Sequence, residues 1–306
     1  MSYKYIGIIG PGAHYRKNIE PLLKKSKFFK IQGFLKKTKT KQKNFFNEKE
    51  FFKKKFDFVY ISCPNESHEK FILKSLSAGF HVICEKPFVT KKKNINKIIN
   101  LSTVKKKLIF EAMMYAYHPV FEYIKKTIKE KKYGRIKYII SNFKFPSIDK
   151  PNNRYLKNEG NGFFFDAAVY PVSIEHYLFK FKSLNKISQQ IIRNKVDLRG
   201  NILIESNKIK RFYFWGEGQN YSNNLEIHFE KSTLYVDKFF SKYTNENIYA
   251  EIHTPNKIII KKFKKINHFN EMLNIIKNNY FNLDFQKRNR KLIEDQVNLL
   301  DIIRSA

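Results

Sequence analysis

The sequence predicts an α/β fold in which a parallel sheet with crossover helices is followed by a sheet of a different kind. From residue 3 to about residue 110, short apolar runs alternate with amphipathic stretches, as in parallel strands joined by helices. After Gly134, strand-like runs succeed one another with little helix between most of them, which indicates an antiparallel or mixed sheet. The 306 residues suffice for two domains, which we expect at residues 1–120 and 121–306.

The first part contains apolar runs with the length and composition of buried strands. Between them lie amphipathic helices such as residues 66–78, which Asn65 can cap at the N-terminus and Gly79 can end. We expect the strands at residues 5–9, 30–35, 58–62, 81–84 and 108–110.

The second part begins with a helix. Pro119 suits a first turn, Val120, Ile124 and Ile128 share one face, and Gly134 closes the segment. We expect strands near residues 136–145, 187–193, 211–215, 225–229 and 257–262, and a closing helix over residues 285–303.

The chain is strongly basic, with 60 Lys and Arg residues against 27 Asp and Glu and a formal net charge of +33. Only nine of the basic residues are arginine, the lysines are spread over the whole length, and Phe, Ile and Asn are also abundant. We interpret this as compositional drift with some attraction for anionic small molecules. Nucleic-acid binding is a third-ranked alternative, because clustered basic side chains would neutralise phosphates.

Cys63 and Cys84 each lie at the end of a predicted buried strand. We interpret them as small core residues in a reducing compartment, and we expect neither a disulfide nor a metal site. No apolar run approaches the length of a membrane span, and no secretory segment precedes the first strand. We therefore expect a cytoplasmic protein without a membrane partner.

The first strand runs into Gly10-Pro11-Gly12, where a dinucleotide fingerprint would have its first two glycines. The first glycine permits a tight turn, and the second lets the backbone approach a pyrophosphate. Tyr15 occupies the place of the third glycine. We predict a Rossmann-type dinucleotide site in which Gly10, Gly12, Ala13 and His14 contact the cofactor.

The second predicted strand ends without an acidic residue. It is followed by Lys36, Lys37 and Thr38, and positive side chains with a hydroxyl group suit a ribose 2′-phosphate. We therefore predict NADP in preference to NAD. The alternative is that these lysines only reflect a lysine-rich chain.

The next two strands end in polar segments that would face the same cofactor. After residues 58–62, Pro64 and Asn65 would bend the chain near the nicotinamide ribose, with His68 one turn into the following helix. We predict cofactor contacts from Ser62, Pro64, Asn65, His68, Glu85 and Lys86.

Lys86 follows the strand 81–84 and lies between Glu85 and Pro87. A charged lysine at the carboxyl edge of a buried strand is costly unless an anionic or reacting group faces it. A Lys-Pro bond can also adopt the cis form, which would fix the direction of the side chain. We therefore predict Lys86 at the reacting centre.

In the second half, the glycine-rich residues 159–162 lead into residues 163–171. Asp166 and Tyr170 are four residues apart and would share one face if this segment is helical. An ammonium group near a tyrosine favours the phenolate and lowers its pKa toward the range useful for proton transfer. The alternative is that the pair only packs and caps a helix.

Taken in order, these segments resemble the Gfo/Idh/MocA family of oxidoreductases. The resemblance rests on residues 10–12, 61–65 with His68, 78–87, 117–119, and Asp166 with Tyr170-Pro171. It implies an N-terminal Rossmann domain with a doubly wound parallel sheet. It also implies a C-terminal α+β domain whose open, largely antiparallel sheet supports a substrate pocket and the contacts of a homo-oligomer, a dimer or tetramer.

The resemblance also assigns roles to single residues. The essential lysine of the family falls on Lys86 and its second-domain aspartate on Asp166. Tyr170 stands where inositol dehydrogenase-like members have histidine, as in members that act on aldoses, dihydrodiols or keto sugar nucleotides. Arg154 resembles an arginine that such enzymes place near the substrate, whereas Ala116 stands where many members have arginine.

These observations predict an NADP-dependent oxidoreductase that interconverts a hydroxyl and a carbonyl group of a sugar or nucleotide sugar by hydride transfer. Lys86, Asp166 and Tyr170 would be catalytic, and Arg154 and Tyr170 would bind the substrate. The alternative is a non-catalytic Rossmann-type scaffold or sensor that binds a dinucleotide or a sugar.

Overall fold

The computed structural model describes residues 3–35, 44–157, 160–179, 186–206, 208–242, 244 and 246–306. The chain divides into two compact units, one of Met1–Ala112 with Met272–Val297 and one of Met113–Glu271 with Asn298–Ala306. Residues 272–297, which we expected in the second domain, therefore pack with the first unit. The domain boundary near residue 120 stays a prediction.

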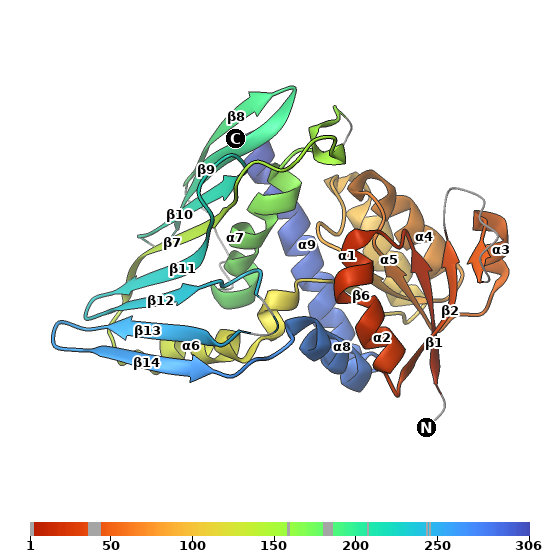
Figure 1. The fold of residues 1–306 in the computed structure, drawn as a ribbon, viewed down its shortest axis with the longest axis horizontal. Helices are drawn as coiled ribbons and strands as arrows, with labels where there is room; N and C mark the ends of the chain where they lie inside the picture. Colours follow the sequence, from red (N-terminus) through yellow and green to blue (C-terminus); the bar gives the residue numbers. More distant parts are fainter. Residues whose placement is uncertain are drawn as a thin grey trace. The chain divides into compact units, whose positions relative to one another are not determined.

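The first unit is built on a parallel sheet, seen with its helices in Figure 1. Its strand order in the described residues is β3-β2-β1-β4-β5-β6. Strand order reverses between β1 and β4, so the sheet is doubly wound, as the sequence predicted. The strands are β1 (Lys4–Ile9), β2 (Phe29–Leu35), β3 (Phe45–Phe46), β4 (Phe58–Ile61), β5 (His81–Cys84) and β6 (Ile109–Glu111).

Helices that lie between these strands in the chain, and parts of two helices near its end, belong to the first unit. They are α1 (Ala13–Asn18), α2 (Glu20–Lys25), α3 (Glu48–Lys53), α4 (His68–Ser77), α5 (Ile95–Val104), α8 (His268–Asn279) and α9 (Leu283–Ser305). The helix expected over residues 66–78 starts later, because Asn65–Ser67 form a 3₁₀ turn before it. Gly79 follows the helix with a φ of +84°, a conformation that suits glycine at a helix end.

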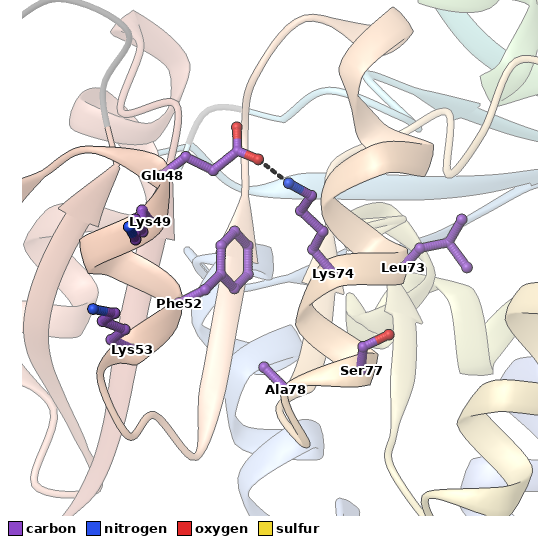
Figure 2. Close-up of a pocket in the computed structure, with 8 residues that line it drawn as sticks. All are labelled: Glu48, Lys49, Phe52, Lys53, Leu73, Lys74, Ser77 and Ala78. Carbon is purple, nitrogen blue, oxygen red and sulfur yellow. Dashed lines mark hydrogen bonds and ion pairs between the residues drawn. The ribbon is translucent and has the colours of Figure 1, made fainter.

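A groove of about 720 Å³ lies between α3 and α4 (Figure 2). Glu48 of α3 is paired with Lys70 and Lys74 of α4 across it. These two ion pairs lower the pKa of Glu48, although burial alone would raise it. The groove is lined by Glu48, Lys49, Phe52, Lys53, Leu73, Lys74, Ser77 and Ala78, none of which we predicted as a site residue.

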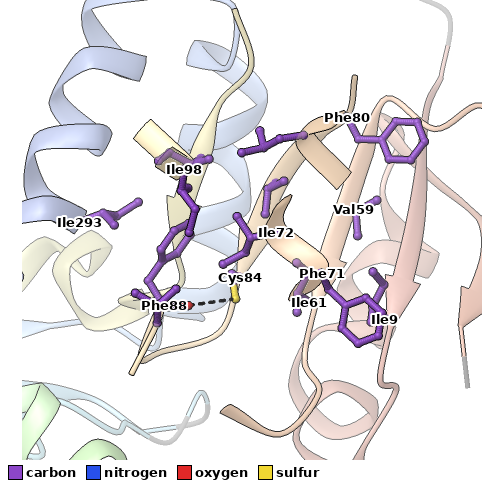
Figure 3. Close-up of a cluster of buried hydrophobic side chains, with 14 of the residues drawn as sticks. Ile9, Val59, Ile61, Phe71, Ile72, Phe80, Cys84, Phe88, Ile98 and Ile293 are labelled. Carbon is purple, nitrogen blue, oxygen red and sulfur yellow. Dashed lines mark hydrogen bonds between the residues drawn. The ribbon is translucent and has the colours of Figure 1, made fainter. Parts of the chain in front are cut away.

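One face of the sheet packs against α3, α4, α5 and part of α9 in a continuous apolar core (Figure 3). Ile9, Val59 and Ile61 contribute from the central strands, and Ile72 and Ile293 contribute from the helices. Ile6, Ile8 and Ile9 of β1 are all fully buried, as expected for a strand covered on both faces.

The second unit is built on a larger sheet with the strand order β14-β13-β12-β11-β7-β10-β9-β8 in the described residues. Its neighbouring strands are antiparallel except β7 and β10, which are parallel, so the predicted largely antiparallel sheet is confirmed. The strands are β7 (Ile136–Lys144), β8 (Lys186–Asn194), β9 (Val196–Ser206), β10 (Ile209–Gly216), β11 (Ser222–Phe229), β12 (Thr233–Asp237), β13 (Ile248–His253) and β14 (Ile258–Phe263).

Helical segments cover one face of this sheet (Figure 1). They are α6 (Pro119–Glu130), the π-helical turn Phe164–Ala168, α7 (Val169–Ile174) and the π-helical turn Glu175–Phe179. Along β11, buried and half-buried side chains alternate, so that Leu225 and Ile227 face the helices.

A buried ion pair fastens the helical layer to the sheet. Arg211 Nε of β10 donates to Glu175 Oε1 over 2.7 Å, and both side chains are at most 1% exposed. Tyr213 also donates its hydroxyl group to Glu175 Oε1. Burial raises the pKa of Glu175, and the bonds from Arg211 and Tyr213 oppose this shift. Removing one partner of such a buried ion pair destabilises the fold, because the other charge stays buried without compensation.

Replacing Arg211 with Met should therefore lower the free energy of unfolding by roughly 3–5 kcal/mol, because Glu175 would remain buried without its counter-charge. Urea unfolding followed by circular dichroism measures the change. The double variant Arg211→Met, Glu175→Leu should recover most of the loss. If the double variant is as unstable as the single one, the uncompensated charge is not the cause.

Candidate active site

The turn after β1 needs its first glycine for steric reasons. Gly10 has a φ of +72°, and a Cβ atom there would lie 2.6 Å from the Cα atom of Cys63. A Cβ atom on Gly12 would meet nothing closer than Gly10 O at 3.9 Å. The backbone at Gly12 is therefore open to the approach of another molecule, which fits the predicted role of the second glycine.

Tyr15 fills the place of the third glycine as a fully buried side chain of α1. Its ring centroid lies 6.0 Å from that of Tyr60 on β4. Its hydroxyl group finds no hydrogen-bond partner among the described residues, and burial raises its pKa. The tyrosine thus takes up space that a glycine would leave for close contact between helix and strand.

Glu85, directly after β5, is the centre of a hydrogen-bond network. Tyr60 donates its hydroxyl group to Glu85 Oε1 over 2.5 Å, and His14 Nε2 lies 3.2 Å from the same oxygen. Burial alone would raise the pKa of Glu85, but His14, Tyr60 and the charge of Lys86 outweigh it and lower the pKa. Glu85 is therefore a carboxylate at neutral pH and connects α1, β4 and the segment after β5.

His68 links the segments that follow β4 and β5. Its Nδ1 atom lies 2.8 Å from Pro87 O and its Nε2 atom 2.9 Å from Cys63 O. A neutral imidazole can donate to only one of these carbonyl groups, so the second bond requires the protonated ring. Burial lowers the pKa of His68 nevertheless, and the two carbonyl groups oppose this shift. Its predicted cofactor contact stays a prediction.

Lys86 lies in a turn whose next two residues, Pro87 and Phe88, both form hydrogen bonds through their backbone. The Lys86-Pro87 peptide bond is cis, the form that we considered for it. Phe88 donates its backbone N–H to Glu111 Oε1 over 2.7 Å. We did not predict Glu111 from the sequence. The sequence signal for Glu111 was its position directly after the strand that we expected at residues 108–110, which pairs with residues 82–84.

The other predicted cofactor residues of the first unit lie in segments that follow the central strands. Ala13 begins α1, and Ser62 follows β4, with its backbone N–H bonded to Ile9 O. Pro64 and Asn65 lie in the turn before α4. Lys36, Lys37 and Thr38 lie outside the described residues, so the structure says nothing of their part in choosing NADP.

The second unit brings together Arg154, Asp166 and Tyr170. Arg154 Nε donates to Asp166 Oδ2 over 2.7 Å. Burial alone would lower the pKa of Arg154, but the charges of Asp166 and Tyr170 outweigh it and raise the pKa. The segment that carries Asp166 and Tyr170 is helical, as the expected shared face requires, although its first turn is π-helical.

Tyr170 is buried and surrounded by aromatic side chains. Its hydroxyl group lies 3.8 Å from Met114 Sδ, and its ring centroid lies 4.7 Å from that of Phe143 and 5.8 Å from that of Phe240. Such surroundings exclude water from a phenol that would exchange a proton. That Lys86 of the first unit meets Tyr170 of the second at one centre stays a prediction.

Asp197 of β9 is a further site residue that we did not predict. Its carboxylate accepts the backbone N–H of Phe164, and Phe163 donates its backbone N–H to Asp197 O. Gly162 has a φ of +91°, and its Cα atom lies against the Asp197 carboxylate, where a Cβ atom would not fit. The glycine-rich approach therefore serves to place the start of the helical segment that carries Asp166.

A metal-binding cluster and a membrane-spanning helix are both absent from the described residues. No group of three or more His, Cys, Asp or Glu side chains there could hold a metal ion. Among the same residues, no helix is both long and apolar enough to cross a membrane.

The doubly wound sheet and its glycine turn define a dinucleotide-binding protein of the Rossmann type. The profile of the "oxidoreductase family, NAD-binding Rossmann fold" matches residues 4–113, and that of the "GFO/IDH/MocA C-terminal domain" matches residues 121–235. These matches cover more than half of the chain. The chain therefore belongs to the Gfo/Idh/MocA family of oxidoreductases.

Two curated relatives illustrate the range of the family. A dTDP-3,4-didehydro-2,6-dideoxy-alpha-D-glucose 3-reductase of Saccharopolyspora spinosa is 25% identical over 60% of this chain. A scyllo-inositol 2-dehydrogenase (NADP(+)) of Bacillus subtilis is 23% identical over 60% of it. The chain spans 57% of the length of each of these relatives.

The fold is shared with solved structures over nearly the whole chain. A 3-ketoreductase from Actinomadura kijaniata in complex with NADP and TDP-benzene has a TM-score of 0.92 at 18% identity, covering 99% of this chain and 98% of that one. An aldose-aldose oxidoreductase from Caulobacter crescentus has a TM-score of 0.85 at 14% identity, covering 100% and 97%. At these identities the likeness establishes the fold.

The two glycines of the first turn should respond differently to substitution. Gly10→Ala should destabilise the protein by at least roughly 2 kcal/mol, because its positive φ and the Cys63 backbone both oppose a Cβ atom. Gly12→Ala is the matched control and should change the unfolding free energy by less than about 0.5 kcal/mol. Urea unfolding measures both. Equal losses in the two variants would contradict the steric assignment.

Proposed function

We propose that the protein is an NADP-dependent oxidoreductase that interconverts a hydroxyl and a carbonyl group of a sugar or nucleotide sugar. The observation that carries the proposal is the fixed Lys86 turn, which follows β5 at the same edge of the sheet as the strand-order reversal, one strand away from it, and ligands of such sheets bind at that edge. The names of the relatives support the substrate class, since one is a nucleotide-sugar 3-reductase and another is an NADP-dependent inositol dehydrogenase.

The residues of the first unit fit a dinucleotide. The open backbone at Gly12 admits a pyrophosphate, and Gly10, Ala13 and His14 belong to the same turn and helix start. When bound, the nicotinamide ring supplies or accepts the hydride. Lys86 would polarise the substrate oxygen and stabilise the negative charge that develops on it. The solved 3-ketoreductase contains NADP, which supports the same cofactor here.

The residues of the second unit would handle the substrate and its proton. Tyr170 would give its hydroxyl proton to the substrate oxygen in reduction and take it back in oxidation. Asp166 is held by Arg154, so the pair would act together: Asp166 would bind a sugar hydroxyl group or orient Lys86, and Arg154 would bind the substrate. A cytoplasmic location and a homo-oligomeric state stay predictions of the sequence.

Tyr15 and the drifted composition favour the non-catalytic alternative, a scaffold or sensor of the Rossmann type. Tyr15 replaces a glycine that normally allows close packing of helix and strand. Activity on any sugar would exclude this alternative, whereas a scaffold would bind NADPH without turnover.

The proposed cofactor is tested by measuring NADPH binding through the fluorescence of the nucleotide. The purified protein should bind NADPH, and Gly12→Ala should weaken binding at least about tenfold while leaving the fold intact, because the added Cβ atom occupies the space of the phosphate. A folded protein with no affinity for NADPH or NADP would defeat the proposed function.

Turnover tests the reacting centre. It is measured as NADPH consumption with keto sugars and as NADP reduction with scyllo-inositol and D-xylose. Lys86→Met should leave NADPH bound and abolish turnover, and Tyr170→Phe should lower kcat by roughly 10²–10⁴-fold. Lys49→Met, at an exposed lysine of α3, is the matched control and should retain activity. Retained turnover in Lys86→Met would contradict the assigned role.

A further inference from the structure

Glu111 is a buried carboxyl group that the proposed mechanism does not use. It ends β6, is only 2% exposed, and lies opposite Cys84 in the register of β5 and β6. A carboxyl group is costly to bury, so such a position calls for a structural or functional reason.

A hydrogen bond to the Glu111 carboxyl group offsets part of the free-energy cost of burying it. Glu111 Oε1 accepts the backbone N–H of Phe88 over 2.7 Å, two residues after Lys86. Together with the hydrogen bond between His68 and Pro87 O, this bond fixes the chain on the C-terminal side of Lys86. On the N-terminal side of Lys86, Tyr60 and His14 hold Glu85 in place. The lysine therefore lies in a turn whose two ends are both anchored to the sheet.

The pKa values of the two carboxyl groups near Lys86 are shifted in opposite directions. Glu85 has a lowered pKa and stays ionised. Burial raises the pKa of Glu111 to about 7, while the Phe88 N–H and the charge of Lys86 oppose the shift and the charge of Glu85 adds to it. The Cys84 thiol is the other titratable group that senses Glu111, and burial raises its pKa well above the usual value. Carboxyl groups whose surroundings push their pKa values apart commonly divide acid and base roles between them.

We propose that Glu111 positions the Lys86 turn, and that ionisation of its carboxyl group makes the site favour oxidised over reduced nicotinamide. This inference rests on the proposed function. The oxidised ring carries a positive charge and the reduced ring carries none, so a new negative charge near Lys86 stabilises the oxidised form selectively. At lower pH the neutral Glu111 favours the reduced cofactor, which is the state that reduction of a carbonyl group requires.

The first test concerns the group itself and needs no cofactor. In the unfolded chain Glu111 ionises near its usual pKa of 4.5, whereas in the fold it ionises near 7. Its contribution to stability is thus complete below about pH 4.5 and is lost as the pH rises to about 7. Relative to Glu111→Gln, the folding equilibrium constant of the natural protein should fall by up to roughly 300-fold across this window. Urea unfolding at a series of pH values measures it.

The second test separates positioning from charge by amide hydrogen exchange. Glu111→Gln keeps an oxygen acceptor for the Phe88 N–H, and Glu111→Leu removes it. Exchange at Phe88 should be nearly unchanged in the first variant and at least about tenfold faster in the second. Equal exchange in all three proteins would overturn the positioning role. If the leucine variant does not fold, slow exchange at Phe88 in the glutamine variant decides alone.

The third test measures the dissociation constants of NADPH and NADP from about pH 5.5 to about pH 8.5. In the natural protein the preference should shift toward NADP by roughly three- to tenfold through pH 7, and in Glu111→Gln it should not change with pH. Glu122→Gln, at an exposed glutamate of α6, is the control and should behave as the natural protein does. A pH-independent preference in the natural protein would overturn the inference, whereas failure to bind either nucleotide would overturn the proposed function instead.

Discussion

The fixed turn from Glu85 to Phe88 is the constraint on which the candidate site depends. Parallel strands end at a common edge, and the chain must leave that edge through segments whose polar groups still need partners. Here Tyr60 and His14 hold Glu85, His68 holds Pro87 O, and Glu111 holds the Phe88 N–H. Each bond comes from a different element, so the position of the backbone on both sides of Lys86 follows from the packing of the first unit.

Arginine supplies the buried ion pair of the second unit. Lysine accounts for most of the charge and lies largely on the surface, as in the pairs of Lys70 and Lys74 with Glu48. Two of the rarer arginines form a buried or a half-buried ion pair, Arg211 with Glu175 and Arg154 with Asp166, whereas Arg135 pairs with Glu230 at the surface. A planar guanidinium is less strongly hydrated than an ammonium group and loses less on burial. The second unit thus relies on arginine to hold the helical layer that carries Tyr170.

Two kinds of charge therefore shape the candidate site, and they act at different ranges. The large positive charge of the surface attracts anionic cofactors and substrates at a distance and is screened by salt. Within the first unit, the charge of Lys86 acts at short range on Glu85 and Glu111 and opposes the effect of burial on the pKa of each. Only charges at short range discriminate well between two forms of a ligand that differ at one ring.

The sequence by itself predicted the two kinds of sheet, the glycine turn and five of the six strands of the first sheet. These features are local, since apolar periodicity, glycine turns and residues at strand ends are written in consecutive positions. It did not reveal Glu111, Tyr60 or Asp197, which join residues 23, 25 and 33 positions away. No local pattern indicated that residues 272–297 group with the first unit. Only the tertiary structure decided these contacts, because strand register and burial bring distant segments together and no local pattern records which polar group meets which.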